Sequence, residues 1–139
     1  MRIIGIDYGD SRVGIALSDP LGITAQGLKT LPNKVYDKML DALVEIINTN
    51  GVCRAVIGMP KNLNGSLGIR AEVTNDFASD LKSRIPELEI VFQDERLTTV
   101  EASTFLNSTN TRGKSLKAVI DTVAAEIILQ SYLYANPIN

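Results

Sequence analysis

The chain has 139 residues, of which 45% are hydrophobic and 22% charged, with a net charge of −2 at neutral pH. This size and balance argue against disorder and predict one globular domain over residues 1–139. The chain contains no histidine and one cysteine, which excludes histidine-dependent catalysis and zinc sites built from histidine or several thiolates. A bound metal would have oxygen ligands, which favours magnesium, manganese or calcium.

The same composition also indicates the cellular compartment of the protein and the kinds of partner that it can bind. No apolar stretch is long enough to span a bilayer, and the lone Cys53 cannot form an internal disulfide. We therefore expect a cytoplasmic protein with no membrane partner. The net charge gives no overall attraction for nucleic acid, so local basic patches and metal ions would have to attract a polyanion.

Three short apolar segments joined by tight turns come first along the chain. They predict an antiparallel meander of strands over residues 2–6, 13–17 and 24–31. Apolar residues then recur at helical spacing from Val35 to Ile47, and Gly51 ends that helix.

Alternation of strand and helix follows. A short buried strand is expected at 54–58 and another at 88–92. Between them, apolar residues at every fourth position from 69 to 81 predict a helix that Pro86 closes.

The C-terminal third adds helix and loop. Thr98 and Glu101 fit a capping box for a short helix to about Leu106, 107–113 is expected to be a loop, and the last helix should span about 115–134. Three strands followed by alternating elements predict an α/β fold with a mixed five-stranded sheet and helices on both faces.

Acidic residues stand where apolar strands end, and ligands of α/β sheets gather at strand ends. Asp7 closes the first strand, and either Asp94 or Glu95 closes the fifth, since alternation puts these two on opposite sides. Asp121 lies in the last helix, whose Ala124 and Ala125 would allow close packing on the sheet.

Each acid also has an ordinary structural interpretation. Asp121 could pair with Lys117 one turn earlier, a contact worth about 0.3–0.5 kcal/mol. Asp7 could cap a turn, and Glu95 could be a surface residue. Three converging acids without histidine nevertheless fit a site for one or two hard divalent cations that activate water.

Four segments together resemble the YqgF/RuvX family, whose members are described as Holliday junction resolvases or pre-16S rRNA nucleases with an RNase H-like fold. The resemblance covers essentially the whole chain and rests on Gly5-Ile6-Asp7-Tyr8-Gly9 with 12–16 and Ser18-Asp19, residues 58–65 with Arg70-Ala71, residues 94–99, and Lys117 with 121–125.

The resemblance implies that Asp7, Glu95 and Asp121 are the catalytic, metal-binding acids, and that the Asp7 strand is central in the sheet. Better-known resolvases of the RuvC type show paired acids three residues apart near the last helix. Here residues 118 and 124 are both alanine. That departure fits the YqgF branch and puts cleavage of four-way junctions in doubt.

The expected activity is hydrolysis of RNA phosphodiester bonds, at the 5′ end of precursor 16S rRNA. Asp7 would bridge two magnesium ions, for which manganese could substitute, with Glu95 and Asp121 on either side. Candidates to hold the nucleic-acid backbone are Arg12, Arg70, Arg96, Lys114 and Lys117, although Lys114 and Lys117 could equally belong to a solvated face.

Three alternatives stay open at this point. The substrate could be branched DNA, in which case symmetric resolution of a four-way junction needs two sites and hence a homodimer, whereas RNA processing allows a monomer. The strand hairpin at Asp7 also opens ATP-binding folds, which need two such domains. The chain could finally be a non-catalytic adaptor that binds nucleic acid without cleaving it.

Overall fold

A computed structural model describes residues 1–60, 68–94 and 116–136, with only the backbone course of the last helix given for 116–121. Five strands form one sheet in the order β3-β2-β1-β4-β5. Neighbours β1, β2 and β3 are antiparallel, and β1, β4 and β5 are parallel. The strands are β1 (Arg2–Tyr8), β2 (Arg12–Ser18), β3 (Ala25–Pro32), β4 (Val52–Met59) and β5 (Glu89–Asp94).

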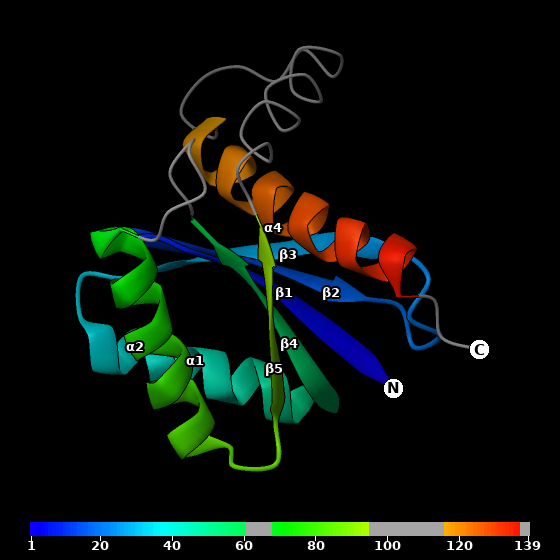
Figure 1. The fold of residues 1–139 in the computed structure, drawn as a ribbon, viewed down its shortest axis with the longest axis horizontal. Coiled ribbons are helices and arrows are strands. Elements are labelled where there is room, and N and C mark those ends of the chain that lie inside the picture. Colours follow the sequence, from blue (N-terminus) through cyan, green and yellow to red (C-terminus); the bar gives the residue numbers. More distant parts are fainter. Residues whose placement is uncertain (61–67, 95–115, 137–139) are drawn as a thin grey trace.

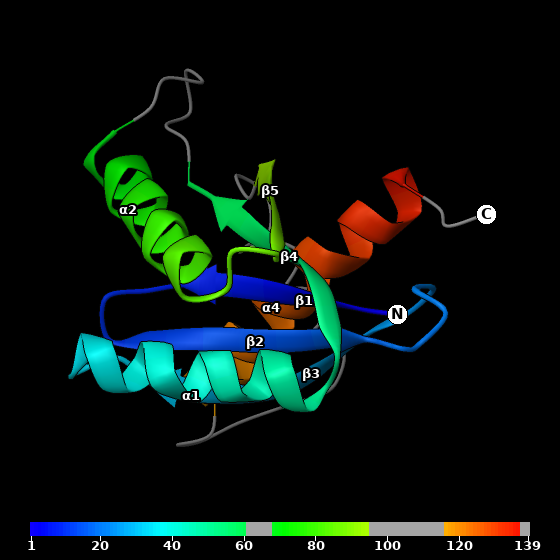
Figure 2. The same ribbon diagram turned by 90° about the horizontal axis from the view of Figure 1, so that it is seen from below.

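The predicted mixed sheet with a central first strand is thus confirmed, and helices cover both of its faces (Figures 1 and 2). Helices α1 (Tyr36–Thr49) and α2 (Ile69–Arg84) pack on one face, and α4 (Leu116–Ala135) packs on the other. The pleat of β1 separates the two cores: Ile4 and Ile6 belong to the α1/α2 core, whereas Ile3 belongs to the α4 core.

The buried face of α2 matches the predicted one only in part, since Phe77 and Leu81 are buried but Ile69 is not. Ile69 is 78% exposed, because residues four apart advance about 40° round a helix of 3.6 residues per turn. A stripe drawn from Ile69 in steps of four therefore winds round the helix, from the exposed Ile69 to the buried Phe77 and Leu81. The residues that α2 buries are Ala71, Thr74, Phe77, Ala78 and Leu81.

Helix α4 lies directly on the central strand at Gly5. A Cβ atom added to Gly5 would lie 2.6 Å from Leu129 Cβ and 2.8 Å from the Ala125 carbonyl oxygen. Glycine is thus required at this position for the helix to approach so closely. The close packing expected from the alanines of α4 is confirmed, with Gly5 as its partner in the sheet.

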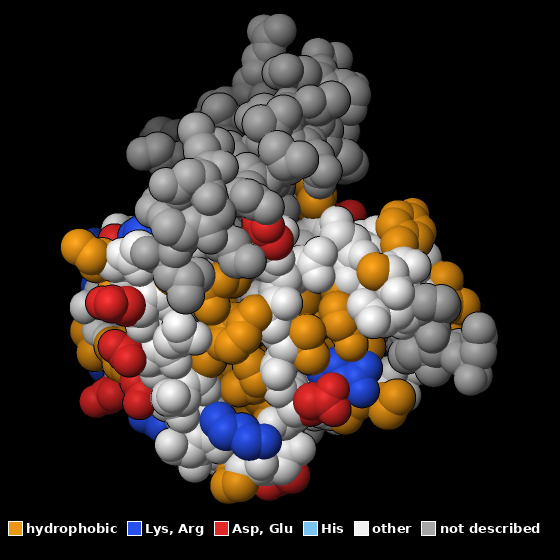
Figure 3. All heavy atoms as spheres, in the orientation of Figure 1, with side chains coloured by type: hydrophobic (Ala, Val, Ile, Leu, Met, Phe, Trp, Pro, Cys, Tyr) orange, Lys and Arg blue, Asp and Glu red, His pale blue; other side chains and the backbone are white. Residues whose placement is uncertain are grey.

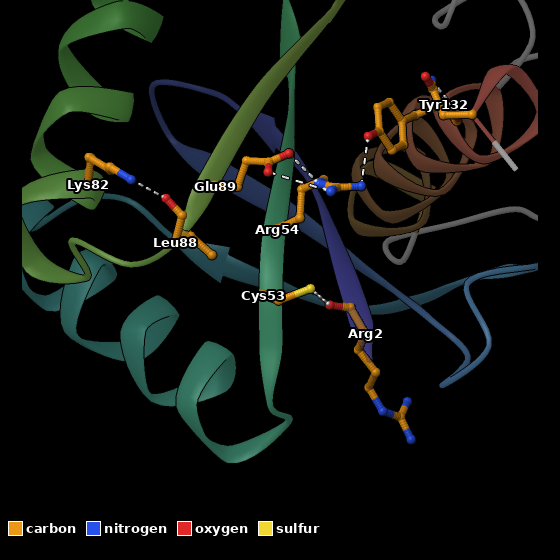
Figure 4. A network of polar contacts seen from close by, with 8 residues as sticks. Arg2, Cys53, Arg54, Lys82, Leu88, Glu89 and Tyr132 are labelled. Carbon is orange, nitrogen blue, oxygen red and sulfur yellow. Dashed lines mark hydrogen bonds and ion pairs between the residues drawn. The ribbon is translucent and has the colours of Figure 1, made fainter. Parts of the chain in front are cut away.

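A polar contact holds the other end of α4. Arg54 of β4 donates to the Tyr132 hydroxyl over 3.1 Å, and its Nε lies 2.6 Å from Glu89 Oε1 of β5 (Figure 4). One guanidinium therefore connects two strands with the helix.

Side chains of α4 also reach the outer strand β3. Glu126 Oε2 accepts a hydrogen bond from the Gly27 amide (3.2 Å), and Gln130 Oε1 accepts one from the Ala25 amide (2.9 Å). These amides point away from β2, so the helix satisfies donors that a neighbouring strand would otherwise bind. Among the helices described, none is long and apolar enough to cross a membrane.

Candidate functional site

Asp7 is the penultimate residue of the central strand, at its carboxyl end. Its side chain is half-buried and already has a polar partner. The alternation that puts Ile3 and Gly5 under α4 puts Asp7 on the same face. The carboxylate therefore projects on the α4 side of the sheet.

Both strands next to Asp7 carry glycine at its level. Gly14 is its register partner in β2, and Gly58 follows Ile57, the partner of Ile6, in β4. The residue directly beside Asp7 on each adjacent strand therefore has no side chain. A central strand end flanked in this way can accommodate a ligand close to the backbone.

The packing of β5 shows on which face of the sheet Asp94 lies, one of the two acids that alternation left open. Ile90 packs against the α1/α2 core, and Val91 packs against the α4 core. Asp94 therefore lies on the face opposite Asp7, and Gln93 lies on the same face as Asp7. Glu95, two residues after Gln93, is outside the described residues.

Helix α4 brings residue 121 toward the same end of the sheet. Tyr132 contacts Arg54, whose register partner Ile3 is near the start of β1, whereas Ala125 lies over Gly5. The helix is thus antiparallel to β1, and the helical turn before Ala125 lies nearer the carboxyl end of that strand. That turn contains Asp121, whose side chain is outside the description.

The predicted cationic residues have different positions. Arg12 begins β2, is exposed and has a polar partner. Arg70, in the first turn of α2, forms an ion pair with Asp10. Arg96, Lys114 and the side chain of Lys117 lie outside the described residues, as do the expected capping-box helix and the loop at 107–113.

Sequence reasoning missed the residues that hold the turn after Asp7. Asn33 Nδ2 donates to the Gly9 carbonyl over 2.9 Å, and the Asn33 amide donates to the Ser11 carbonyl over 2.9 Å. The Tyr8 ring stacks on Phe77 of α2 with ring centroids 4.3 Å apart. Only the glycine-bearing turn itself signalled this region, because the partners come from remote elements.

A groove lined by described residues lies elsewhere on the molecule. It is shallow and apolar at its floor, runs between α2 and β5 (Figure 3), and is lined by Asn75, Ala78, Ser79, Lys82, Glu89, Ile90 and Phe92. Asp7 does not line it. Within residues 1–60, 68–94 and 122–136, no three acids or thiols are grouped so as to hold a metal.

Comparison with known proteins gives consistent matches over the whole chain. A family model described as RuvX, Holliday junction resolvase, matches residues 1–135. A protein of Halothermothrix orenii named "Putative pre-16S rRNA nuclease" is 46% identical over 140 residues, covering 100% of this chain and 99% of that protein. A protein of Moorella thermoacetica with the same name is 47% identical over 133 residues, covering 96% of this chain and 94% of that protein.

Two solved structures share the fold at low sequence identity. Thermus thermophilus RuvC in complex with a Holliday junction substrate gives a TM-score of 0.58 at 10% identity, covering 99% of this chain and 96% of that one. The Fowlpox virus resolvase bound to Holliday junction DNA gives a TM-score of 0.57 at 8% identity, and the match covers 99% of this chain and 100% of that one. These likenesses confirm the expected RNase H-like fold.

Proposed function

Because the chain belongs to the RuvX family of Holliday junction resolvases, we propose that it is a metal-dependent nuclease whose substrate is the 5′ end of precursor 16S rRNA. A nuclease is a hydrolase of phosphodiester bonds, and relatives of nearly the same length are named for the rRNA precursor. The structural observation that carries the proposal is the position of Asp7, on the α4 side of the central strand end.

The donor set fits a hard divalent cation. The chain lacks histidine, and carboxylate oxygens are the ligands that magnesium and manganese prefer. We assign Asp7, Glu95 and Asp121 to hold the ion, which is magnesium with manganese as a substitute. When bound, the metal would supply an activated water and stabilise negative charge on the leaving oxygen.

The protein's own contribution is to fix these acids relative to one another. Asp7 lies on the middle strand of the sheet, and Asp121 lies on a helix that Gly5 and Arg54 hold against that sheet. Sites built on such rigid elements keep their geometry better than sites on loops. Glu95 directly follows β5, a strand hydrogen-bonded to β4.

Cationic side chains would hold the nucleic-acid backbone. Arg12 is exposed at the start of β2, and Arg96, Lys114 and Lys117 are close in sequence to the proposed acids. Contacts of this kind neutralise phosphates, so binding should weaken as salt increases. In this proposal residues 1–139 form one domain that acts in the cytoplasm, as a monomer or homodimer.

A second candidate substrate is the four-way DNA junction. It is favoured by the family description and by the fold shared with RuvC bound to such a junction. The alanines at 118 and 124 argue against it, because they leave no second acid three residues from Asp121.

The test is cleavage of labelled precursor rRNA and of a synthetic four-way junction, with magnesium, with manganese and with chelator. Asp7→Asn, Glu95→Gln and Asp121→Asn should each abolish metal-dependent cleavage and leave the circular dichroism spectrum unchanged. Asp94→Asn is the matched control, because Asp94 lies on the opposite face of the sheet, and it should cleave like the wild type.

Full activity in Asp7→Asn would remove the proposed mechanism. Cleavage of the junction alone would transfer the proposal to DNA. Absence of cleavage of both substrates by the wild type, with binding retained, would favour a non-catalytic adaptor.

A further inference from the structure

The turn between β1 and β2 is bonded to a helix that follows it by some sixty residues. Arg70 Nη1 lies 2.5 Å from Asp10 Oδ1, and Arg70 Nη2 donates to the Tyr8 carbonyl over 3.4 Å. Arg70 lies in the first turn of α2, which is anchored in the core through Phe77 and Leu81. The guanidinium therefore connects a hairpin turn, a kind of segment that is usually mobile, to a helix that is fixed in the core.

Contacts from other elements complete this attachment. Tyr8 stacks on Phe77 with an interplanar angle of 16°, and Asn33, which follows β3, donates hydrogen bonds to the carbonyls of Gly9 and Ser11. Each of residues 8 to 11 is thus bonded or packed against a distant part of the chain. Asp7 directly precedes this segment, so any shift of the turn is transmitted to it.

The ion pair also affects how Asp10 and Arg70 can interact with a phosphate of the substrate. Asp10 is the acid nearest to Asp7 along the chain, and its side chain is 75% exposed. Its charge is compensated by the guanidinium, which limits repulsion of a phosphate near Asp7. Nη1 and Nη2 of Arg70 each have a partner on the turn, so a phosphate would compete with Asp10 for the same guanidinium.

We propose that Arg70 is a positioning residue: through Asp10 and the Tyr8 carbonyl it fixes the turn behind Asp7, and so orients that carboxylate for catalysis. The proposal deepens the nuclease function and rests on it. It replaces the phosphate contact that the sequence predicted for Arg70.

The first test compares Arg70→Gln, Asp10→Asn and the double variant. If the pair positions Asp7, each single variant should lower kcat about two- to fivefold, the range that an exposed ion pair can supply. KM should stay within about twofold. The double variant should be no slower than the slower single variant, because both changes break the same contact.

The matched control is Arg84→Gln. Arg84 is at the other end of α2 and pairs with Asp41 and Asp37 of α1, so it has a similar partner but no contact with the turn. It should retain wild-type kcat. An equal loss of kcat in Arg84→Gln would show a general effect of loosening α2 and would overturn the proposal.

A phosphate contact gives the opposite pattern. Arg70→Gln would then raise KM and reduce the salt dependence of binding by about one charge, as measured by fluorescence anisotropy. Asp10→Asn would bind nucleic acid equally well or more tightly and keep its kcat. That result would return Arg70 to the nucleic-acid interface.

A second measurement does not depend on activity. The Asn33 amide is bonded to the Ser11 carbonyl, so its hydrogen-exchange rate reports opening of the turn. Arg70→Gln and Asp10→Asn should raise that rate about two- to fivefold, the range expected for an exposed ion pair. Arg84→Gln should not change it.

The two measurements separate the two proposals. If the wild type cleaves neither substrate, the nuclease proposal fails while accelerated exchange still supports the attachment of the turn. If the wild type cleaves and exchange at Asn33 is unchanged in both variants, the positioning role of Arg70 is refuted and the nuclease proposal stands.

Discussion

The substitution Gly5→Ala probes the contact on which the geometry of the site depends. The new Cβ would lie 2.6 Å from Leu129 Cβ and 2.8 Å from the Ala125 carbonyl oxygen, whereas carbon atoms in contact are normally about 3.5–4.0 Å apart. Both obstacles belong to the backbone of α4 or to its first side-chain atom, so no rotamer change relieves them. The helix must move by roughly 1 Å.

Two opposing effects determine how much unfolding free energy Gly5→Ala loses. Overpacking of a core costs about 1–3 kcal/mol, and replacing a strand glycine by alanine returns about 0.5–1 kcal/mol. The net loss of unfolding free energy should be about 1–2 kcal/mol. For a chain of this length that lowers the melting temperature by about 3–8 °C.

The effect on activity should exceed the effect on stability. A shift of α4 moves Asp121 relative to Asp7, and misplacement by about 1 Å can cost on the order of a hundredfold in rate. Thermal melting followed by circular dichroism, and kcat at a temperature where the variant is folded, measure the two effects.

Gly27→Ala is the graded control. Its Cβ would lie 3.2 Å from Thr122 Cβ, a smaller overlap than at Gly5, which a smaller shift of the helix relieves. Its melting temperature should therefore fall less. If Gly5→Ala melts within about 1 °C of the wild type and keeps full kcat, α4 is not seated on β1 in the manner described.

Three further substitutions test the fold and its polar contacts. Ser18→Ala should cost about 1–3 kcal/mol in urea unfolding, because the buried Ser18 hydroxyl accepts from the Ile3 amide over 2.9 Å; an unchanged midpoint would contradict this. Phe77→Ala should cost about 3–5 kcal/mol, since Phe77 is 1% exposed; a loss below about 1 kcal/mol would mean that the site collapses. Burial, and then the hydrogen bond to Asp80, raise the pKa of Tyr36. The contribution of Tyr36 to the free energy of unfolding is therefore fully present below about pH 10, the pKa of an unfolded tyrosine. It is lost progressively as the pH rises above that value. The difference in melting temperature between wild type and Tyr36→Phe should therefore shrink from pH 8 to pH 11, and a constant difference would refute the assignment.

The backbone pattern was predictable from the sequence because short-range rules determine it. Alternation and turn residues located the strands, and a carboxylate directly after an apolar run identified Asp7 as unusual. The exposed Ile69 shows where such rules fail. A run of apolar residues four apart suggests one face, but only packing against the sheet decides which part of that run is buried.

The polar contacts around the site were not predictable in the same way. Asp10 and Arg70 are sixty residues apart, and each has an ordinary sequence context. Their pairing depends on how α2 crosses the sheet, which is a property of the assembled core. Likewise, alternation along the fifth strand could not tell on which face Asp94 lies, and only the packing of Ile90 and Val91 against the two cores assigns it.

The bonding of α4 to the outer strand limits how molecules of this protein can associate. The amides of Ala25 and Gly27 are occupied by Gln130 and Glu126, so a second copy cannot extend the sheet by adding a strand along this part of β3. Self-association through a continuous intermolecular sheet is thereby hindered along this part of β3, so copies that paired backbone to backbone would have to do so along β5, the strand at the opposite edge.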